Sequence, residues 1–123
     1  MPMSLRVRKL NEEPGEPMPG EGHRGVNSVM VVDETEVSSY SCRVLRIEPG
    51  GGTASHSHPR AHVVMALSGA ARVETAQEVT EIRPGMVVTV PGDVPHKFVN
   101  VTNRRAALMV QNLFPRDMSS ETP

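Results

Sequence analysis

Residues 56–62 read HSHPRAH and residues 91–100 read PGDVPHKFVN, and these two stretches are the most informative part of the chain. They hold four of its five histidines: His56, His58, His62 and His96. Neutral imidazole is the commonest protein ligand for a transition metal. Close ligands completed by one from a remote segment are typical of a preorganised metal site. The pattern therefore predicts a metal centre, although any one of these histidines could instead be a hydrogen-bonded core residue.

The segments around the histidines read as short β-strands separated by Gly/Pro turns. Turn signals such as EPGGG at 48–52 and VPGDVP at 90–95 recur along the chain, and no segment has a sustained helical stripe. The expected strands are 27–32, 39–47, 53–57, 62–67, 70–75, 78–82, 86–90, 96–101 and 106–113. Their β-branched content and regular spacing predict an all-β sandwich or barrel.

A helical interpretation of the histidine cluster fails on the same residues. His58 and His62 have the i, i+4 spacing of a metalloprotease helix, but Pro59 biases His58 toward an extended conformation. The glutamate that such a protease needs as general base is also missing from this segment. In a strand, His56 and His58 point the same way, because side chains two apart share a face.

The same alternation assigns other side chains to the face of the histidines. His62, Val64 and Ala66 share one face, as do His96, Phe98 and Asn100. On the strand at 39–47, the face that carries Arg43 can point into the histidine cavity. Arg43 is therefore a candidate contact for a substrate carboxylate, and the alternative is an ordinary surface arginine.

Composition limits the partners of this chain. It has 123 residues, enough for one domain, with 13 Lys+Arg against 14 Asp+Glu and no basic run, so nucleic acid is not expected. The single cysteine, Cys42, excludes an internal disulfide framework and fits a reducing cytoplasm. No apolar run is long enough to span a bilayer, and no signal core is recognisable, so a cytoplasmic protein without membrane contact is expected.

The two ends of the chain differ from its middle. Residues 1–25 are dense in Pro, Gly and Glu, and predict an extended arm that is flexible or adds a strand to a neighbour. His23 in this arm is expected to be a solvated loop residue. The barrel domain is expected over 26–116, followed by a frayed tail at 117–123.

The spacing of the first histidine stretch resembles the first motif of the cupin superfamily. Gly50, five residues, His56, one residue, His58, three residues, His62, six residues and Gly69 match that motif. The usual motif has glutamate where His62 stands.

The second stretch resembles the second cupin motif. Gly85, five residues, Pro91, then His96, three residues and Asn100 match it. The family pattern has glycine where this chain has Asp93, and this should alter the turn without displacing the histidine.

The resemblance implies a small antiparallel β-barrel of the jelly-roll or double-stranded β-helix type, with a metal deep in its mouth. It implies four ligands, His56, His58, His62 and His96, and a homodimer, since small cupins commonly pair. Four neutral ligands would leave the metal its full dipositive charge and favour an anionic or enolic guest. Nitrogen ligands suit Fe, Ni, Cu and Zn, and Mn remains open.

Three functions follow from such a site. The first is a mononuclear metal-dependent oxygenase, a dioxygenase, that acts on a small enolisable or alkene substrate. The second is a non-redox enzyme of the isomerase, lyase or polyketide-cyclase type, in which the metal acts only as a Lewis acid. The third is a domain without catalytic activity that binds a metal or a small ligand.

Overall fold

The computed structural model describes residues 5–33 and 39–113, so the predicted tail at 117–123 lies outside the described residues. Strands make up most of these segments, and their only helical turn is η1 (Leu10–Glu12). The strands are β1 (Glu16–Pro17), β2 (Arg24–Val32), β3 (Tyr40–Gly52), β4 (Ala61–Ser68), β5 (Ala71–Glu74), β6 (Val79–Ile82), β7 (Val87–Val90), β8 (Lys97–Val99) and β9 (Ala106–Leu113). Neither described segment contains a helix that is long and apolar enough to cross a membrane.

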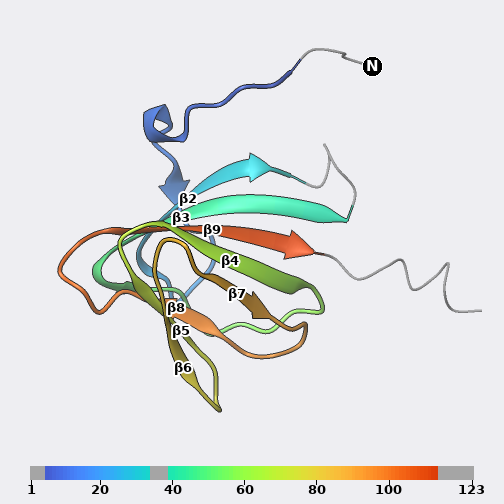
Figure 1. Cartoon of the computed structure of the whole chain (residues 1–123), viewed down its shortest axis with the longest axis vertical. Helices are drawn as coiled ribbons and strands as arrows, with labels where there is room; N and C mark the ends of the chain where they lie inside the picture. The colour runs from blue at the N-terminus through green and yellow to red at the C-terminus, as the bar shows by residue number, and fades with distance from the viewer. Residues whose placement is uncertain (1–4, 34–38, 114–123) are drawn as a thin grey trace, which may run out of the picture.

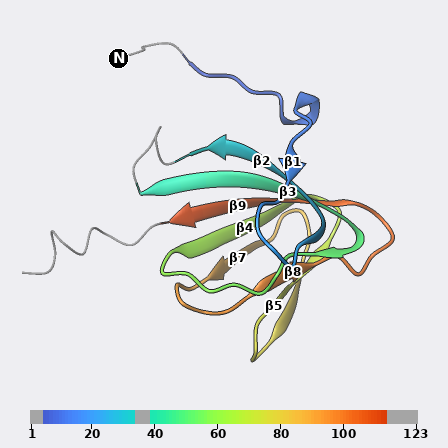
Figure 2. The ribbon, with the colours of Figure 1, turned by 180° about the vertical axis from the view of Figure 1, so that it is seen from behind.

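The strands form one antiparallel sheet that curls toward a barrel. Its order is β6-β5-β8-β3-β9-β4-β7, with β2 paired to β3 and β1 paired to β2. In Figure 1, β2, β3, β9 and β4 lie side by side, and β8, β5 and β6 turn beneath them. The view from behind shows the same arrangement, with the N-terminal segment rising from the β2 side (Figure 2). The predicted all-β barrel is confirmed.

The interior of the barrel is lined by alternate residues of β3, β9 and β4. Leu45 on β3 lies opposite Leu108 on β9, and Leu108 lies opposite Ala66 on β4. All three are buried, as is Val64 on the same face of β4. Full burial of a leucine or valine side chain contributes about 1.5–3 kcal/mol. These contacts therefore hold the three strands together. The predicted inward face of β4 is confirmed.

The EPGGG segment is not the turn that its composition predicts. β3 continues through it to Gly52, where it pairs with Val99 of β8. A Cβ atom on Gly51 would lie 2.5 Å from the carbonyl oxygen of Arg24. Gly51 therefore lets β3 pass close to β2. On its other edge, β3 changes partner here from β9 to β8.

The strand predicted at 53–57 is also wrong. The backbone N–H of Phe98 donates to the Thr53 hydroxyl at 2.9 Å, rather than to a backbone carbonyl of this segment. The ladder is therefore interrupted, and only one isolated bridge follows, between His56 and His96. The segment leaves the sheet as a loop that carries His56 and His58.

The N-terminal segment lies against the rest of its own chain. Arg8 donates to the carbonyl oxygens of Met30 and Val31 at 2.6 and 2.7 Å, and Glu16 and Pro17 pair with β2. Met18 packs against the core cluster. The segment that follows β1 thus becomes part of the barrel wall.

Candidate metal centre

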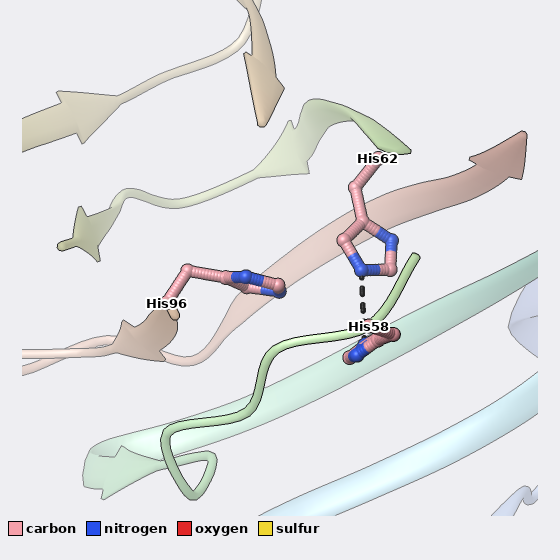
Figure 3. A group of neighbouring side chains, drawn as sticks. All are labelled: His58, His62 and His96. Atoms are coloured by element: carbon pink, nitrogen blue, oxygen red, sulfur yellow. Dashed lines mark hydrogen bonds between the residues drawn. The ribbon is translucent and has the colours of Figure 1, made fainter. Parts of the chain in front are cut away.

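Three of the predicted ligands converge inside the barrel. His62 points inward from β4 because it shares a strand face with the buried Val64, and His96 lies directly before β8. Both side chains are buried, with only 4% and 5% of their surfaces exposed. His58 comes from the loop before β4 and is half-buried. Figure 3 shows the three rings turned toward a common point.

The spacing of their nitrogens fits a transition metal. His62 Nε2 lies 3.1 Å from His58 Nε2, and the ligand nitrogens of all three residues lie within 4.8 Å of one another. Nitrogens each about 2.1 Å from one ion are roughly 3.0–3.4 Å apart at octahedral or tetrahedral angles. The group could therefore hold one ion with only a small inward movement. Without a metal, the contact between His58 and His62 acts as an N–H···N hydrogen bond.

A backbone contact sets the orientation of His96. Its Nδ1 lies 2.8 Å from the carbonyl oxygen of Val94, to which it donates its proton. The Nε2 atom of His96 then carries the free lone pair. Metal-binding histidines typically donate their second ring N–H in this way, which fixes the tautomer that binds the ion.

Burial keeps two of the three imidazoles neutral. It lowers the pKa of His62 from 6.5 to about 4, with further lowering from the nearby His96 and His58, while a contact with Asn112 opposes this shift. Burial, helped chiefly by Arg60, also lowers the pKa of His58, and Asp93 partly offsets this. Only a neutral imidazole can bind a metal, so both side chains are ready to do so at neutral pH.

His56, the fourth predicted ligand, is not part of this group. Its side chain is exposed, and its ring centre lies 6.1 Å from that of His58. Its backbone is fixed by two hydrogen bonds with His96, of 3.0 and 2.9 Å. The side chain still lines the same cavity, so a role for His56 as fourth ligand stays a prediction.

The three histidines lie in the wall of a cavity of about 520 Å³, a size typical of small-molecule sites. Arg43 also lines this cavity, as its strand register predicted. Phe98 and Val110 form apolar parts of the wall, whereas Leu108 is fully buried in the core and is not among the lining residues.

The assignment of His23 to a solvated loop is wrong. His23 is half-buried and lines the cavity, and its Nδ1 accepts a hydrogen bond from the backbone N–H of Ala54 at 3.1 Å. Its ring contacts the ring of His56 edge-on, at 5.3 Å between centres. Burial and the nearby His56 lower its pKa. The Gly-rich sequence around His23 carries no apolar period, so pattern analysis had no signal that would place it here.

The turn before His96 carries Asp93 where the family pattern has glycine. Asp93 has a φ of 65° and so occupies the left-handed region that glycine favours; aspartate is one of the few other residues that enters it readily. The N–H of Asp93 donates to the His58 carbonyl oxygen at 2.7 Å. This contact joins the two histidine-bearing segments.

Several solved structures share this fold. The polyketide cyclase RemF from Streptomyces resistomycificus superposes with a TM-score of 0.79 at 20% identity, over 92% of this chain and 81% of its own. A predicted oxalate decarboxylase from Thermotoga maritima gives 0.80 at 16%, over 90% and 100%. A sugar phosphate isomerase from Silicibacter pomeroyi gives 0.71 at 24%, over 89% and 76%. At these identities the likeness shows the fold alone.

No curated protein sequence matches this chain. The family model described as the cupin domain matches residues 43–111, which is more than half of the 123 residues. The matched region holds the three converging histidines and the strands that position them. The chain therefore belongs to the cupin domain family.

Proposed function

We propose that this protein is a mononuclear metal-dependent oxygenase that acts on a small enolisable or alkene substrate. The proposal is based on the convergence of three imidazoles, from His58, His62 and His96, in the wall of a cavity of about 520 Å³. Three protein ligands leave coordination positions free, whereas a closed structural site would use four. Open positions beside one another are what a reaction between a substrate and dioxygen requires.

The residues of the chain have distinct parts in this proposal. His58, His62 and His96 would hold the ion, and Val94 keeps His96 in the tautomer that binds it. A bound Fe, Mn, Ni, Cu or Zn ion would supply Lewis-acid polarisation and, where it is redox-active, electron transfer with dioxygen. The apolar wall orients the substrate and limits the access of water. With three histidines as ligands, the exposed His56, which lines the same cavity, would exchange a proton with the substrate.

The second candidate is a non-redox Lewis-acid enzyme. Two of the proteins with this fold are named a polyketide cyclase and a sugar phosphate isomerase. Reactions of this class need a metal that polarises a carbonyl group and a base that moves a proton. No carboxylate is among the described lining residues, so His56 would again be the base.

Metal content tests the ligand set first. Protein purified without added metal is analysed by elemental mass spectrometry, and affinity is then measured by titration of the chelator-treated protein. Ala substitutions of His58, His62 and His96 should each lower the affinity by about tenfold or more. His23→Ala, which removes a cavity histidine outside this group, is the matched control. Circular dichroism confirms that each variant is folded.

Oxygen consumption then separates the two reactions. The metal-loaded protein is mixed with a panel of 1,3-diketones and activated alkenes in an oxygen electrode, and products are analysed with labelled dioxygen. The proposal expects substrate-dependent oxygen uptake with both labelled atoms in the products. Exchange of the substrate's acidic proton with deuterated solvent, without oxygen uptake, would establish the Lewis-acid enzyme instead. Tight metal binding with neither activity would indicate a binding domain without catalytic activity.

A further inference from the structure

The charged side chains that line the cavity all have the same sign. Two arginines, Arg43 and Arg60, are among its described lining residues, and no aspartate or glutamate is. The neutral ligands of the candidate metal centre would not reduce the charge of a bound dication. Low-dielectric walls strengthen the attraction of such a cavity for an anion.

Arg43 lacks the glutamate partner that four other described arginines have. Its side chain is half-buried, and Nη1 donates to the Ser28 hydroxyl at 2.9 Å and lies 3.9 Å from the Met18 sulfur. Within residues 5–33 and 39–113 it forms no ion pair. Glutamate partners are found instead for Arg8, Arg72, Arg83 and Arg105. A partly buried charge without a counter-charge destabilises a protein, which makes Arg43 a position where an external anion is favoured.

Strand register places Arg43 at a distance from the metal ligands. Arg43 on β3 is directly opposite Val110 on β9, and His62 on β4 is opposite the next inward residue of β9, Asn112. Because β9 separates β3 from β4, their backbones are about 10 Å apart. Val110 and Phe98 provide apolar surface in the same cavity. A ligand that reaches both groups therefore needs an apolar body between two polar ends.

We propose that the cavity binds an organic carboxylate, with Arg43 as the anchor of the carboxylate group. This inference rests on the proposed function, because it assigns the other end of the ligand to the metal centre. The planar guanidinium has five N–H donors in a fork that matches a carboxylate in a two-point contact. Ser28 holds one arm of this fork in place. The apolar body of the ligand lies against Val110 and Phe98.

The N-terminal segment forms part of the cavity wall. Met18 lies at the guanidinium of Arg43, and Pro19 and His23 also line the cavity, His23 against the ring of His56. His23 is held by its hydrogen bond from Ala54. Met18, which lies outside the region that matches the family model, therefore limits the size of the ligand near its anchor.

Binding of simple probes tests the inference independently of metal and turnover. The probes are benzoate, phenylacetate and 3-phenylpropanoate, each with its primary amide, and phenyl phosphate. Dissociation constants are measured by ligand-observed NMR on chelator-treated and on metal-loaded protein. The chelator-treated arm is informative even when the proposed oxygenase activity fails. The variants are Arg43→Gln, Arg43→Lys and, as a matched control on the surface, Arg83→Gln.

The expected result is that at least one acid binds to the chelator-treated protein about tenfold more tightly than its amide. Arg43→Gln should remove this preference, Arg43→Lys should retain part of it, and Arg83→Gln should leave it unchanged. The inference is overturned if no acid is preferred over its amide, or if the preference survives Arg43→Gln. Tighter binding of phenyl phosphate than of every acid would also overturn it in favour of a phosphate ester. Loss of metal binding with the acid preference intact would refute the proposed function alone.

Discussion

Protonation of His62 should destabilise the metal-free protein. The pKa of this side chain is about 4 in the folded chain, against 6.5 for an ordinary histidine. The unfolded chain therefore takes up a proton at higher pH than the folded chain does. The contribution of neutral His62 to the free energy of unfolding is fully present above pH 6.5. It falls as the pH is lowered from 6.5 to 4 and is lost below pH 4.

The size of the effect follows from these two values. Since a pKa difference of one unit corresponds to about 1.4 kcal/mol, the free energy of unfolding should be about 2 kcal/mol lower at pH 5.0 than at pH 7.5. Solvent screens a charge on His62 only weakly, because the side chain is 4% exposed. The lowered pKa of His58 acts in the same direction.

Urea unfolding in the presence of a chelator measures this loss. Far-UV circular dichroism is the suitable signal, because the chain has no tryptophan and one tyrosine. His62→Gln should remove most of the dependence on pH, whereas His56→Gln, which replaces an exposed histidine of the same region, should keep it. Parallel pH profiles for wild type and His62→Gln would refute the argument. If His62→Gln does not fold, the wild type provides the test: an NMR titration midpoint near 6.5 for His62 would refute the lowered pKa.

Three other changes probe the turns and the core. Asn100→Ala should lower the free energy of unfolding by about 2–3 kcal/mol in the same urea assay, because a fully buried amide that donates at 2.9 and 2.7 Å to two backbone carbonyls is lost. Gly92→Ala would place a Cβ atom 2.2 Å from the Pro59 carbonyl oxygen; the turn must move, and metal affinity in calorimetric titration should fall by about tenfold. Burial raises the pKa of the Cys42 thiol, so disulfide reagents at pH 8 should modify it slowly in the native protein and rapidly in urea.

Alternation along strands was a reliable guide to the interior of the barrel. His62, Val64 and Ala66 all turned out to be buried on one face, as were His96, Phe98 and Asn100. This prediction succeeds because a strand that covers a core has only two faces, and a shift of one residue would expose its apolar side chains. The family motifs added the barrel type. The predicted homodimer and cytoplasmic location stay predictions.

Loop positions followed no such rule. His56 and His58 would share a face in a strand, but the Thr53 hydroxyl interrupts the ladder. The His56 side chain is therefore exposed, whereas that of His58 is half-buried. Glycines 50–52 have the composition of a turn, yet they belong to β3. In both places a contact with a remote strand decides the conformation, and no local pattern reports it.

The sequence by itself determined that the chain is an all-β barrel with inward-facing histidines, because periodicity and motif spacing are local properties. Tertiary structure alone decided which imidazoles converge, that His23 reaches the cavity, and that Arg43 has no carboxylate partner among the described residues. The physical reason is that ligand geometry and charge pairing depend on distances between segments far apart in the chain. Those distances are fixed only when β3, β9 and β4 are in register.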